Sequence, residues 1–279
     1  MATRVGEPAA EPRETLPPRA LPGAAALEQV AGMMLLLWQT LVAAACPPYT
    51  WKADFVEETW LILRRCLLPV MISTTFFALG APGLQGGNIV DIFGTVDRLG
   101  AFFMATTLRE FAPWINGMVI AGVAGTAICA DLGARKVRDE IDALSVMGLD
   151  PIKALVVPRF LALGVVTALM NLVAIVMGIV GGFLAAVVVF QETTAGYLST
   201  FTSNLSMPEL LGSVAKTSVF GFIVGIVVCF KGLHVQGGPQ GVGRAVNQAV
   251  VIAFVAIWSF NSVFTQILLA AYPETGNLH

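Results

Sequence analysis

A dense group of ionisable side chains lies between two long apolar runs, in residues 131–151. Its members are Arg135, Lys136, Arg138, Asp139, Glu140 and Asp142. A charged side chain at the centre of a bilayer costs about 3 kcal/mol, so this segment must lie in water. A charged surface held in water between apolar runs is suited to receiving another molecule.

The apolar residues of this segment predict its local structure. Ala134, Val137, Ile141, Leu144 and Gly148 follow a 3-4-3-4 spacing, which places them on one stripe of a helix. Gly148 and the Asp-Pro pair at 150–151 are signals that end a helix. The amphipathic helix is either a solvated connector or a docking helix, and its length favours docking because connectors are usually shorter.

Three other ionisable residues lie at or inside apolar runs. Arg109 and Glu110 are adjacent at the edge of one run, and Lys216 lies within another. Charges near hydrocarbon are costly unless they are paired or face a cavity. Arg109 and Glu110 therefore either end a helix at the interface or form a polar feature of a substrate pathway. For Lys216 three alternatives are open: its side chain extends to the membrane surface, pairs with an acidic residue or contacts a lipid head group.

Patterns typical of catalysis or metal binding are missing from the sequence. It contains no HExxH, EF-hand or catalytic-triad pattern, and the Gly-rich turn at 236–243 lacks the ending of a phosphate loop. The four cysteines have no C-x-x-C spacing, so we expect all of them to be buried apolar residues: Cys46, Cys66, Cys129 and Cys229. We expect neither an enzyme nor a bound cofactor or metal in this chain.

Composition places these residues in a membrane protein. Of the 279 residues, 56% are hydrophobic and 12% charged, and the mean hydropathy is +0.79, whereas soluble domains carry about 25% charged residues. Several apolar runs approach the roughly 20 residues that a helix needs to cross a bilayer. The fold class is therefore an all-α integral membrane protein. The net charge of −2 gives no indication of nucleic-acid binding.

The elements follow from hydropathy. Residues 1–23 predict a disordered cytoplasmic tail. In residues 24–45 the polar residues fall within about one third of the helix circumference, which favours a helix in the membrane interface over a sixth span. Five spans are expected at about 66–84, 108–130, 160–190, 210–230 and 248–271. Pro69 and the Gly-Ala-Pro-Gly at 80–83 predict a kinked or short first span.

Basic residues set the expected orientation. The loop at 131–159 holds five of them and the turn at 231–244 two, whereas 191–209 and the residues after 271 hold none. This bias predicts that the charged segment and the N-terminus are cytoplasmic. Residues 273–279 would then be an extracytoplasmic tail. A sixth span at 24–45 would move the N-terminus outside.

Small residues recur in two of the spans and predict close helix packing, in a tight bundle or a dimer. They are Gly117, Ala121 and Gly125 in the second span, and Gly178, Gly181 and Gly182 in the third.

Several motifs, in order, resemble the MlaE/YrbE permease family. They are LREFAP at 108–113, AGVAG at 121–125, ADLG at 130–133, EIDALSVMGLDP at 140–151 and PR at 158–159. Residues 216–221 and 237–243 also look like that family. The resemblance covers about residues 24–272, and the Pro-rich tail before them lies outside it.

The resemblance implies the permease subunit of an ABC-type lipid transporter that works with MCE-domain proteins. Such permeases have an interfacial N-terminal helix and about five spans, and they pair as dimers. The charged helix, residues 131–148, would be the coupling helix that docks on a separate ATPase, which binds ATP and Mg²⁺. Its docking residues would be Arg135, Arg138, Asp139, Glu140, Asp142, Leu144 and Met147.

The resemblance also implies a lipid pathway and a membrane. The pathway residues would be Arg109, Glu110, Phe76, Phe77 and Lys216. The Gly-rich turn looks like members of actinobacterial MCE operons, which encode two paralogous permeases and so favour a heterodimer in the inner (plasma) membrane. A secondary transporter or channel, and a passive anchor for an MCE assembly, are the competing functions. The sequence names neither the lipid nor the direction of transport.

Overall fold

The computed structural model describes residues 24–95 and 98–272, and every regular element in this part of the chain is helical. The predicted tails at 1–23 and 273–279 lie outside the described residues. The first three long rods combine α-helix with short π-helical turns. The first rod comprises α2 (Lys52–Ala78), η1 (Leu79–Gly86) and α3 (Gly87–Ile92). The second rod comprises α4 (Leu99–Thr106), η3 (Thr107–Phe111), α5 (Ala112–Ile120), η4 (Ala121–Gly125) and α6 (Thr126–Val137).

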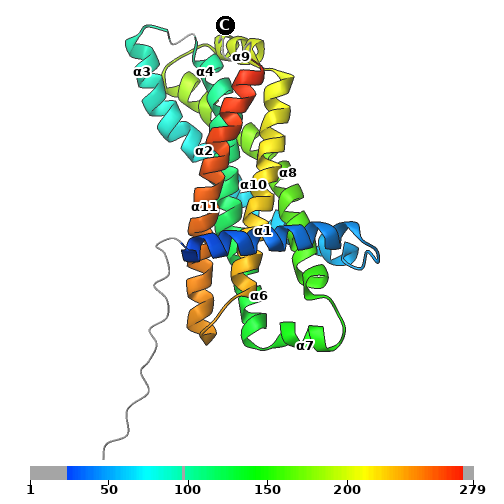
Figure 1. Cartoon of the computed structure of the whole chain (residues 1–279). Helices are drawn as coiled ribbons and strands as arrows, with labels where there is room; N and C mark the ends of the chain where they lie inside the picture. Colours follow the sequence, from blue (N-terminus) through cyan, green and yellow to red (C-terminus); the bar gives the residue numbers. More distant parts are fainter. Residues whose placement is uncertain (1–23, 96–97, 273–279) are drawn as a thin grey trace, which may run out of the picture.

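The charged helix α7 (Glu140–Val146) joins the second rod to the third. The third rod comprises η5 (Ile152–Val156), α8 (Val157–Phe183) and η6 (Leu184–Val189). A short helix, α9 (Thr194–Asn204), leads to the last two rods, α10 (Met207–Leu233) and α11 (Gly238–Ala271). In Figure 1, α7 lies at one end of the bundle, and α9 and the last residues of α11 lie at the other.

The N-terminal helix α1 (Ala24–Ala45) has a different direction from the rods. Among the described residues, six helical segments, α1 included, are long and apolar enough to cross a membrane. Figure 1 shows α1 lying across the bundle, at a steep angle to α10 and α11. This placement agrees with the expected interfacial helix and leaves five rods as spans.

Part of the polar side of α1 packs against the bundle. Thr40 is fully buried and donates to the Leu36 carbonyl oxygen at 2.7 Å, and Gly32 faces the ring of Phe230. The outer side is apolar, and its exposed residues include Leu35 and Trp38. Met33 and Leu36 are buried beside Thr40, so α1 docks on the bundle through these three residues and turns its other apolar residues outward.

The rods are longer than hydropathy predicted. The second span was expected at 108–130 but the rod runs from Leu99 to Val137, and the first begins at Lys52. Charged residues at the rod ends stay helical because they are paired within the chain, as Asp131 is with Arg135 at 3.1 Å. The expectation for the cysteines is wrong at one position, because Cys46, which follows α1, is exposed while the other three are buried.

Close helix packing is confirmed, and it lies within this chain. A Cβ on Gly181 would stand 2.5 Å from the Thr75 carbonyl oxygen, and one on Gly182 2.6 Å from the Phe103 ring. On α10, a Cβ on Gly221 would stand 2.3 Å from the Leu163 carbonyl oxygen. These contacts bring α2 and α10 against α8.

We expect Gly221→Ala to destabilise the bundle by about 1–3 kcal/mol, because the added methyl meets backbone that cannot move aside. Gly122→Ala is the matched control, since nothing lies within 4 Å of a Cβ there. It should leave stability unchanged or raise it by up to about 1 kcal/mol. Thermal unfolding of the purified variants in detergent measures both, and an equal effect at the two glycines would contradict the packing argument.

Candidate functional site

A buried polar cluster forms where the π-turn η3 faces α10 and α11. Arg109 and Glu110 lie on this turn and point to different partners. The Arg109 Nε donates to a Glu209 carboxylate oxygen at 2.5 Å, and the two side chains form an ion pair. The Glu110 carboxylate accepts hydrogen bonds from Asn261 at 2.6 Å and Thr265 at 2.8 Å. π-turns are frequent at functional sites.

Lys216 completes the cluster from α10. Its side chain is buried and donates to the Arg109 carbonyl oxygen and to the Thr265 hydroxyl at 3.3 Å. Within the described residues it makes no ion pair at salt-bridge distance, so it neither snorkels to the surface nor pairs directly with an acid. Two cations and two carboxylates therefore share one polar site, which the membrane-spanning rods enclose.

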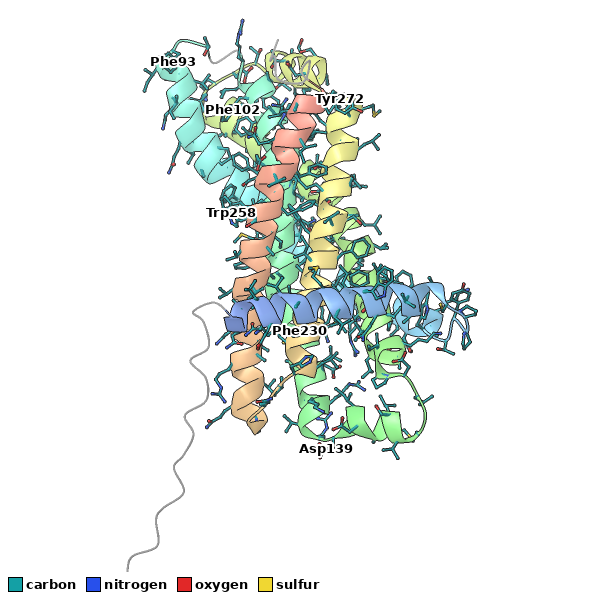
Figure 2. All side chains as sticks on the ribbon, in the orientation of Figure 1. Phe93, Phe102, Asp139, Phe230, Trp258 and Tyr272 are labelled. Atoms are coloured by element: carbon teal, nitrogen blue, oxygen red, sulfur yellow. The ribbon has the colours of Figure 1, made fainter. Side chains whose placement is uncertain are left out.

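The cluster lies far from α7 along the bundle. Lys216 precedes Phe230 by fourteen residues, which is about 21 Å along the helix axis. Phe230 lies at the level of α1, as Figure 2 shows. The cluster is thus in the half of the bundle remote from α7. Its narrow cleft is lined by Leu108, Arg109, Glu209, Ser213, Lys216, Thr265, Leu268 and Leu269.

The structure brings some of the predicted pathway residues together and separates another. Arg109, Glu110 and Lys216 meet as described. Phe77 lies near them through ring contacts with Phe111 and Trp114, at centroid distances of 5.4 and 5.8 Å. Phe76 is instead exposed on α2, with 69% of its surface accessible.

Sequence reasoning missed three members of the cluster. Glu209 falls just outside the span expected at 210–230, although it is in the first turn of α10. Asn261 and Thr265 are four residues apart in an apolar run, so they share one helix face. Two polar residues on one face of an apolar helix are a sequence signal by which this side of the cluster could have been found.

The charged segment is two helices and not one. The predicted stripe over 131–148 is wrong at residues 138–139, where α6 has ended and Asp139 adopts a left-handed conformation with φ 59°. Residues 131–137 extend the second span, and only α7 lies across the end of the bundle. The expected C-terminal stop is confirmed, because Gly148 has φ 77°.

The acidic residues of α7 are paired within the chain. The Glu140 carboxylate accepts from Arg138 at 2.6 Å, and Asp142 pairs with Lys136 at 3.0 Å. The hydrogen bond from Arg138 lowers the pKa of the Glu140 carboxyl below its usual value. These pairs hold α7 against the end of α6.

The apolar residues of α7 divide into two sets. Ile141 is buried and Leu144 is half-buried against the core, so this part of the predicted stripe faces the protein, whereas Val137 and Gly148 are exposed. Val146, Met147 and Leu149 are 89%, 65% and 52% exposed. We call these three residues the apolar tip.

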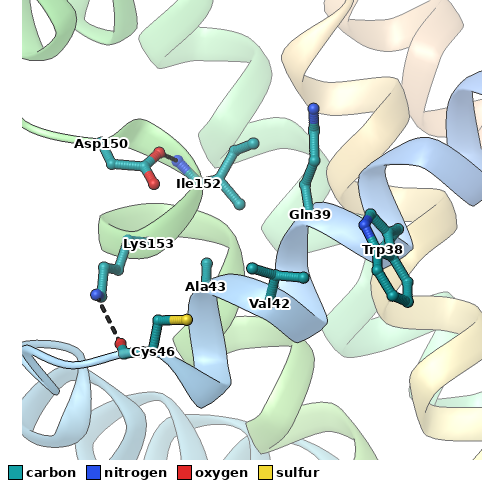
Figure 3. Close-up of a pocket in the computed structure, with 8 residues that line it drawn as sticks. All are labelled: Trp38, Gln39, Val42, Ala43, Cys46, Asp150, Ile152 and Lys153. Carbon is teal, nitrogen blue, oxygen red and sulfur yellow. Dashed lines mark hydrogen bonds between the residues drawn. The ribbon is translucent and has the colours of Figure 1, made fainter.

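The segment after α7 is tied to the end of α1. Lys153 donates from Nζ to the Cys46 carbonyl oxygen at 2.8 Å, across a hollow drawn in Figure 3. Trp38 and Gln39 line its other side, and Asp150 lies beside Lys153. A displacement of the α7 segment would therefore act on the interfacial helix.

Arg159 links three rods close to α7. Its guanidinium is buried and pairs with Glu58 at 3.0 Å and Asp131 at 2.8 Å, and it also donates to the Leu155 carbonyl oxygen at 2.9 Å. These groups join α2, α6 and the third rod. The two sequence motifs at 130–133 and 158–159 thus meet in space.

A profile of the permease MlaE family matches residues 55–267, well over half of the chain. The chain belongs to the MlaE permease family. The match includes the buried cluster, the Arg159 pairs and α7. This membership, with the five apolar rods, makes the chain a multi-pass membrane protein and the membrane component of a transporter.

Curated relatives agree with this MlaE-family assignment. A probable ABC transporter permease protein of Rickettsia typhi is 32% identical over 75% of this chain and 83% of its own length. The intermembrane phospholipid transport system permease protein MlaE of Haemophilus influenzae is 26% identical over 77% and 83%. The chloroplast protein trigalactosyldiacylglycerol 1 of Arabidopsis thaliana is 29% identical over 68% of this chain and 55% of its own length.

Proposed function

We propose that this chain is the permease subunit of an ATP-driven lipid transporter that works with MCE-domain proteins, and that it moves a lipid or fatty acid across the cell envelope. The observation that carries the proposal is the apolar tip, which lies at the C-terminal end of α7 and in the turn after it. Three exposed apolar side chains on a water-facing segment are costly unless a partner covers them. The names of the Rickettsia and Haemophilus relatives support an ABC-type partner and a lipid cargo.

The partner at α7 would be a cytoplasmic ATPase that binds ATP and Mg²⁺. The sequence has no phosphate loop of its own, so nucleotide hydrolysis requires a second chain. Apolar anchors surrounded by charged residues are the usual anatomy of such an interface. Val146 and Met147 would be the anchors, and Arg138, Glu140 and Asp142 the rim.

Movement at α7 can reach the buried cluster through two connections. Lys153 joins the segment after α7 to α1, and Arg159 joins α6 to α2 and α8. The second rod, which ends in α6, also carries Arg109 and Glu110 on η3. A shift of α6 would therefore alter the cleft between η3, α10 and α11.

The buried cluster would be the polar part of the lipid pathway. Arg109 and Lys216 supply cations that suit a phosphate or carboxylate head group, and Phe77 and Phe111 supply apolar surface beside them. Among the described residues Lys216 has only neutral partners, so an anionic head group could pair with it and leave the Arg109–Glu209 ion pair in place. Phe76, on the outer surface of α2, would meet acyl chains.

The assembly would contain two permeases in the inner membrane. Two chains would enclose a cavity lined by their first rods and the outer half of their second rods, and the Gly-rich turn favours a paralogous partner over a second copy. We place the α7 end in the cytoplasm, since the segment at 131–159 carries five basic residues. The opposite end, with α9, would face the MCE proteins.

The experiment that tests this proposal reverses the acidic charges of α7. Glu140→Lys with Asp142→Lys should weaken co-purification of the ATPase about tenfold and lower ATP-dependent lipid transfer in parallel. Each reversal replaces an acidic rim charge with a basic one and repels the cationic neighbour with which the acid is paired. Asp54→Lys, a charge reversal at an exposed position on α2, is the control. Unchanged association and unchanged transfer would contradict the docking role.

Buried charges in the membrane are also what a secondary transporter uses. Lipid transfer that persists in vesicles without any ATPase would favour that function. A passive anchor makes a different prediction, since reversing the charges of Arg109 and Glu110 would then leave lipid movement intact in an assembled complex.

A further inference from the structure

Two hollows meet at Lys231, where α1 crosses α10 and α11. One is lined mainly by polar and charged residues, among them Glu28, His234 and Arg244. The other is mainly apolar and is lined by Val251 and Ile252 of α11. Gln29, Lys231 and Gln248 line both, so a single molecule could occupy the two together.

Lys231 is a buried cation with neutral partners. It is 8% exposed and donates to the side-chain oxygens of Gln29 at 2.8 Å and Gln248 at 3.1 Å. Within residues 24–95 and 98–272 it makes no ion pair. Burying an ammonium group without a counter-ion is unfavourable, so an anion in the hollow would stabilise it.

The charges around the polar hollow favour an anion. Arg244 is exposed, and its guanidinium lies beside Gly237, at the start of α11. His234 is exposed and contacts the Phe230 carbonyl oxygen at 2.8 Å. Glu28 is the acidic residue of the lining and is itself exposed, so water screens it. Two basic side chains, Lys231 and Arg244, therefore face one screened carboxylate.

The apolar hollow continues onto the outer surface of α11. Val251 and Val255 lie one helical turn apart, and they are 61% and 62% exposed. The polar hollow is level with α1, which lies in the expected interfacial plane, as Figure 2 shows at Phe230. A head group at that depth would leave an acyl chain free to run along α11 into the bilayer.

We propose that these hollows bind an anionic phospholipid of the leaflet on the α7 side. Its phosphate would contact Lys231 and Arg244, and one acyl chain would lie along Val251 and Val255. Basic pockets between spans at the membrane surface bind anionic head groups in this way. Lys231 follows Lys216 by fifteen residues, about 22 Å along α10, so this site is separate from the buried cluster. The bound lipid would fix α1 against α10 and α11.

Lipid retention by the full-length protein tests the site. The protein is reconstituted with equal parts of phosphatidylcholine and phosphatidylglycerol, re-extracted in detergent and analysed by native mass spectrometry. The wild type should retain phosphatidylglycerol in preference to phosphatidylcholine. Lys231→Gln and Arg244→Gln should each weaken that retention about fivefold. Arg244 is exposed, so its variant keeps the test valid if the buried lysine proves necessary for folding.

Arg64→Gln is the matched control, because it removes an exposed cation from α2. It should retain phosphatidylglycerol as the wild type does, and Val251→Asn should retain less. Equal retention by all variants would overturn the proposal, since the retained lipid would then lie elsewhere. Displacement of phosphatidylglycerol by inorganic phosphate would overturn it too, in favour of a site for a free anion. No ATPase takes part, so the result is independent of the proposed transport function.

Discussion

Replacing Arg109 with Met is expected to lower the free energy of unfolding by about 3–5 kcal/mol and to abolish lipid transfer. The Glu209 side chain is 2% exposed, and its cation is the guanidinium of Arg109. Without that cation, the buried carboxylate of Glu209 would have no ion pair within the described residues. Thermal unfolding in detergent measures the stability, and lipid exchange between vesicles measures the transfer.

Glu209→Gln in the Arg109→Met background separates the charge from the packing. The double variant removes both members of the ion pair, so it should recover most of the lost stability, and the two changes should be strongly non-additive. Transfer should stay low in the double variant if Arg109 contacts the lipid head group. Full recovery of transfer would mean that the pair only supports the fold, and additive stability losses would contradict the ion-pair argument.

The arrangement of the spans could be predicted because it depends on polarity averaged over long segments. Hydropathy gave the five rods, and the one-sided polarity of 24–45 distinguished a crosswise helix from a sixth span. The ends of the rods could not be predicted in the same way. Residues such as Asp131 and Arg135 continue the helix because they find partners, and hydropathy treats them as breaks.

The charged residues of the candidate site could be predicted from the sequence, but their partners could not. Arg109, Glu110 and Lys216 attract attention because each is a charge beside hydrocarbon. Their partners depend on how η3 faces α10 and α11, which is long-range packing. Glu209 follows a polar segment, so it did not stand out as a charge beside hydrocarbon. An acidic residue in the first turn of a helix is also common and does not by itself indicate a site.

The break between α6 and α7 shows a different limit. The apolar stripe from Val137 to Leu144 has a helical period, and a continuous helix would satisfy it. The chain turns at Asp139 because Ile141 and Leu144 then reach the core, while the pairs made by Glu140 and Asp142 hold the turn. The spacing of apolar residues alone does not distinguish a continuous helix from two helices joined by a turn at Asp139.

Replacing Val146 with Asp is expected to weaken ATPase association at least about a hundredfold, more than charge reversal at Glu140 and Asp142. An apolar anchor at the centre of an interface contributes about 2 kcal/mol or more, and burying a new carboxylate there adds a desolvation cost. Val146 is 89% exposed in the isolated chain, so the substitution should leave the fold unchanged. Glu140 and Asp142 are paired internally, and their reversal acts on the partner only through the rim. Titration of the purified ATPase against the reconstituted permease measures both effects.

Met147→Asp should behave as Val146→Asp does, because the two residues share the apolar tip. Leu198→Asp is the control, since Leu198 is 47% exposed on α9, at the opposite end of the bundle. It should leave ATPase association unchanged. If Val146→Asp binds normally while Glu140→Lys with Asp142→Lys does not, then the ATPase contacts the acidic side of α7, and the apolar tip has another partner. Because the two surfaces lie on one short helix, only this comparison of apolar and charged variants assigns the contact.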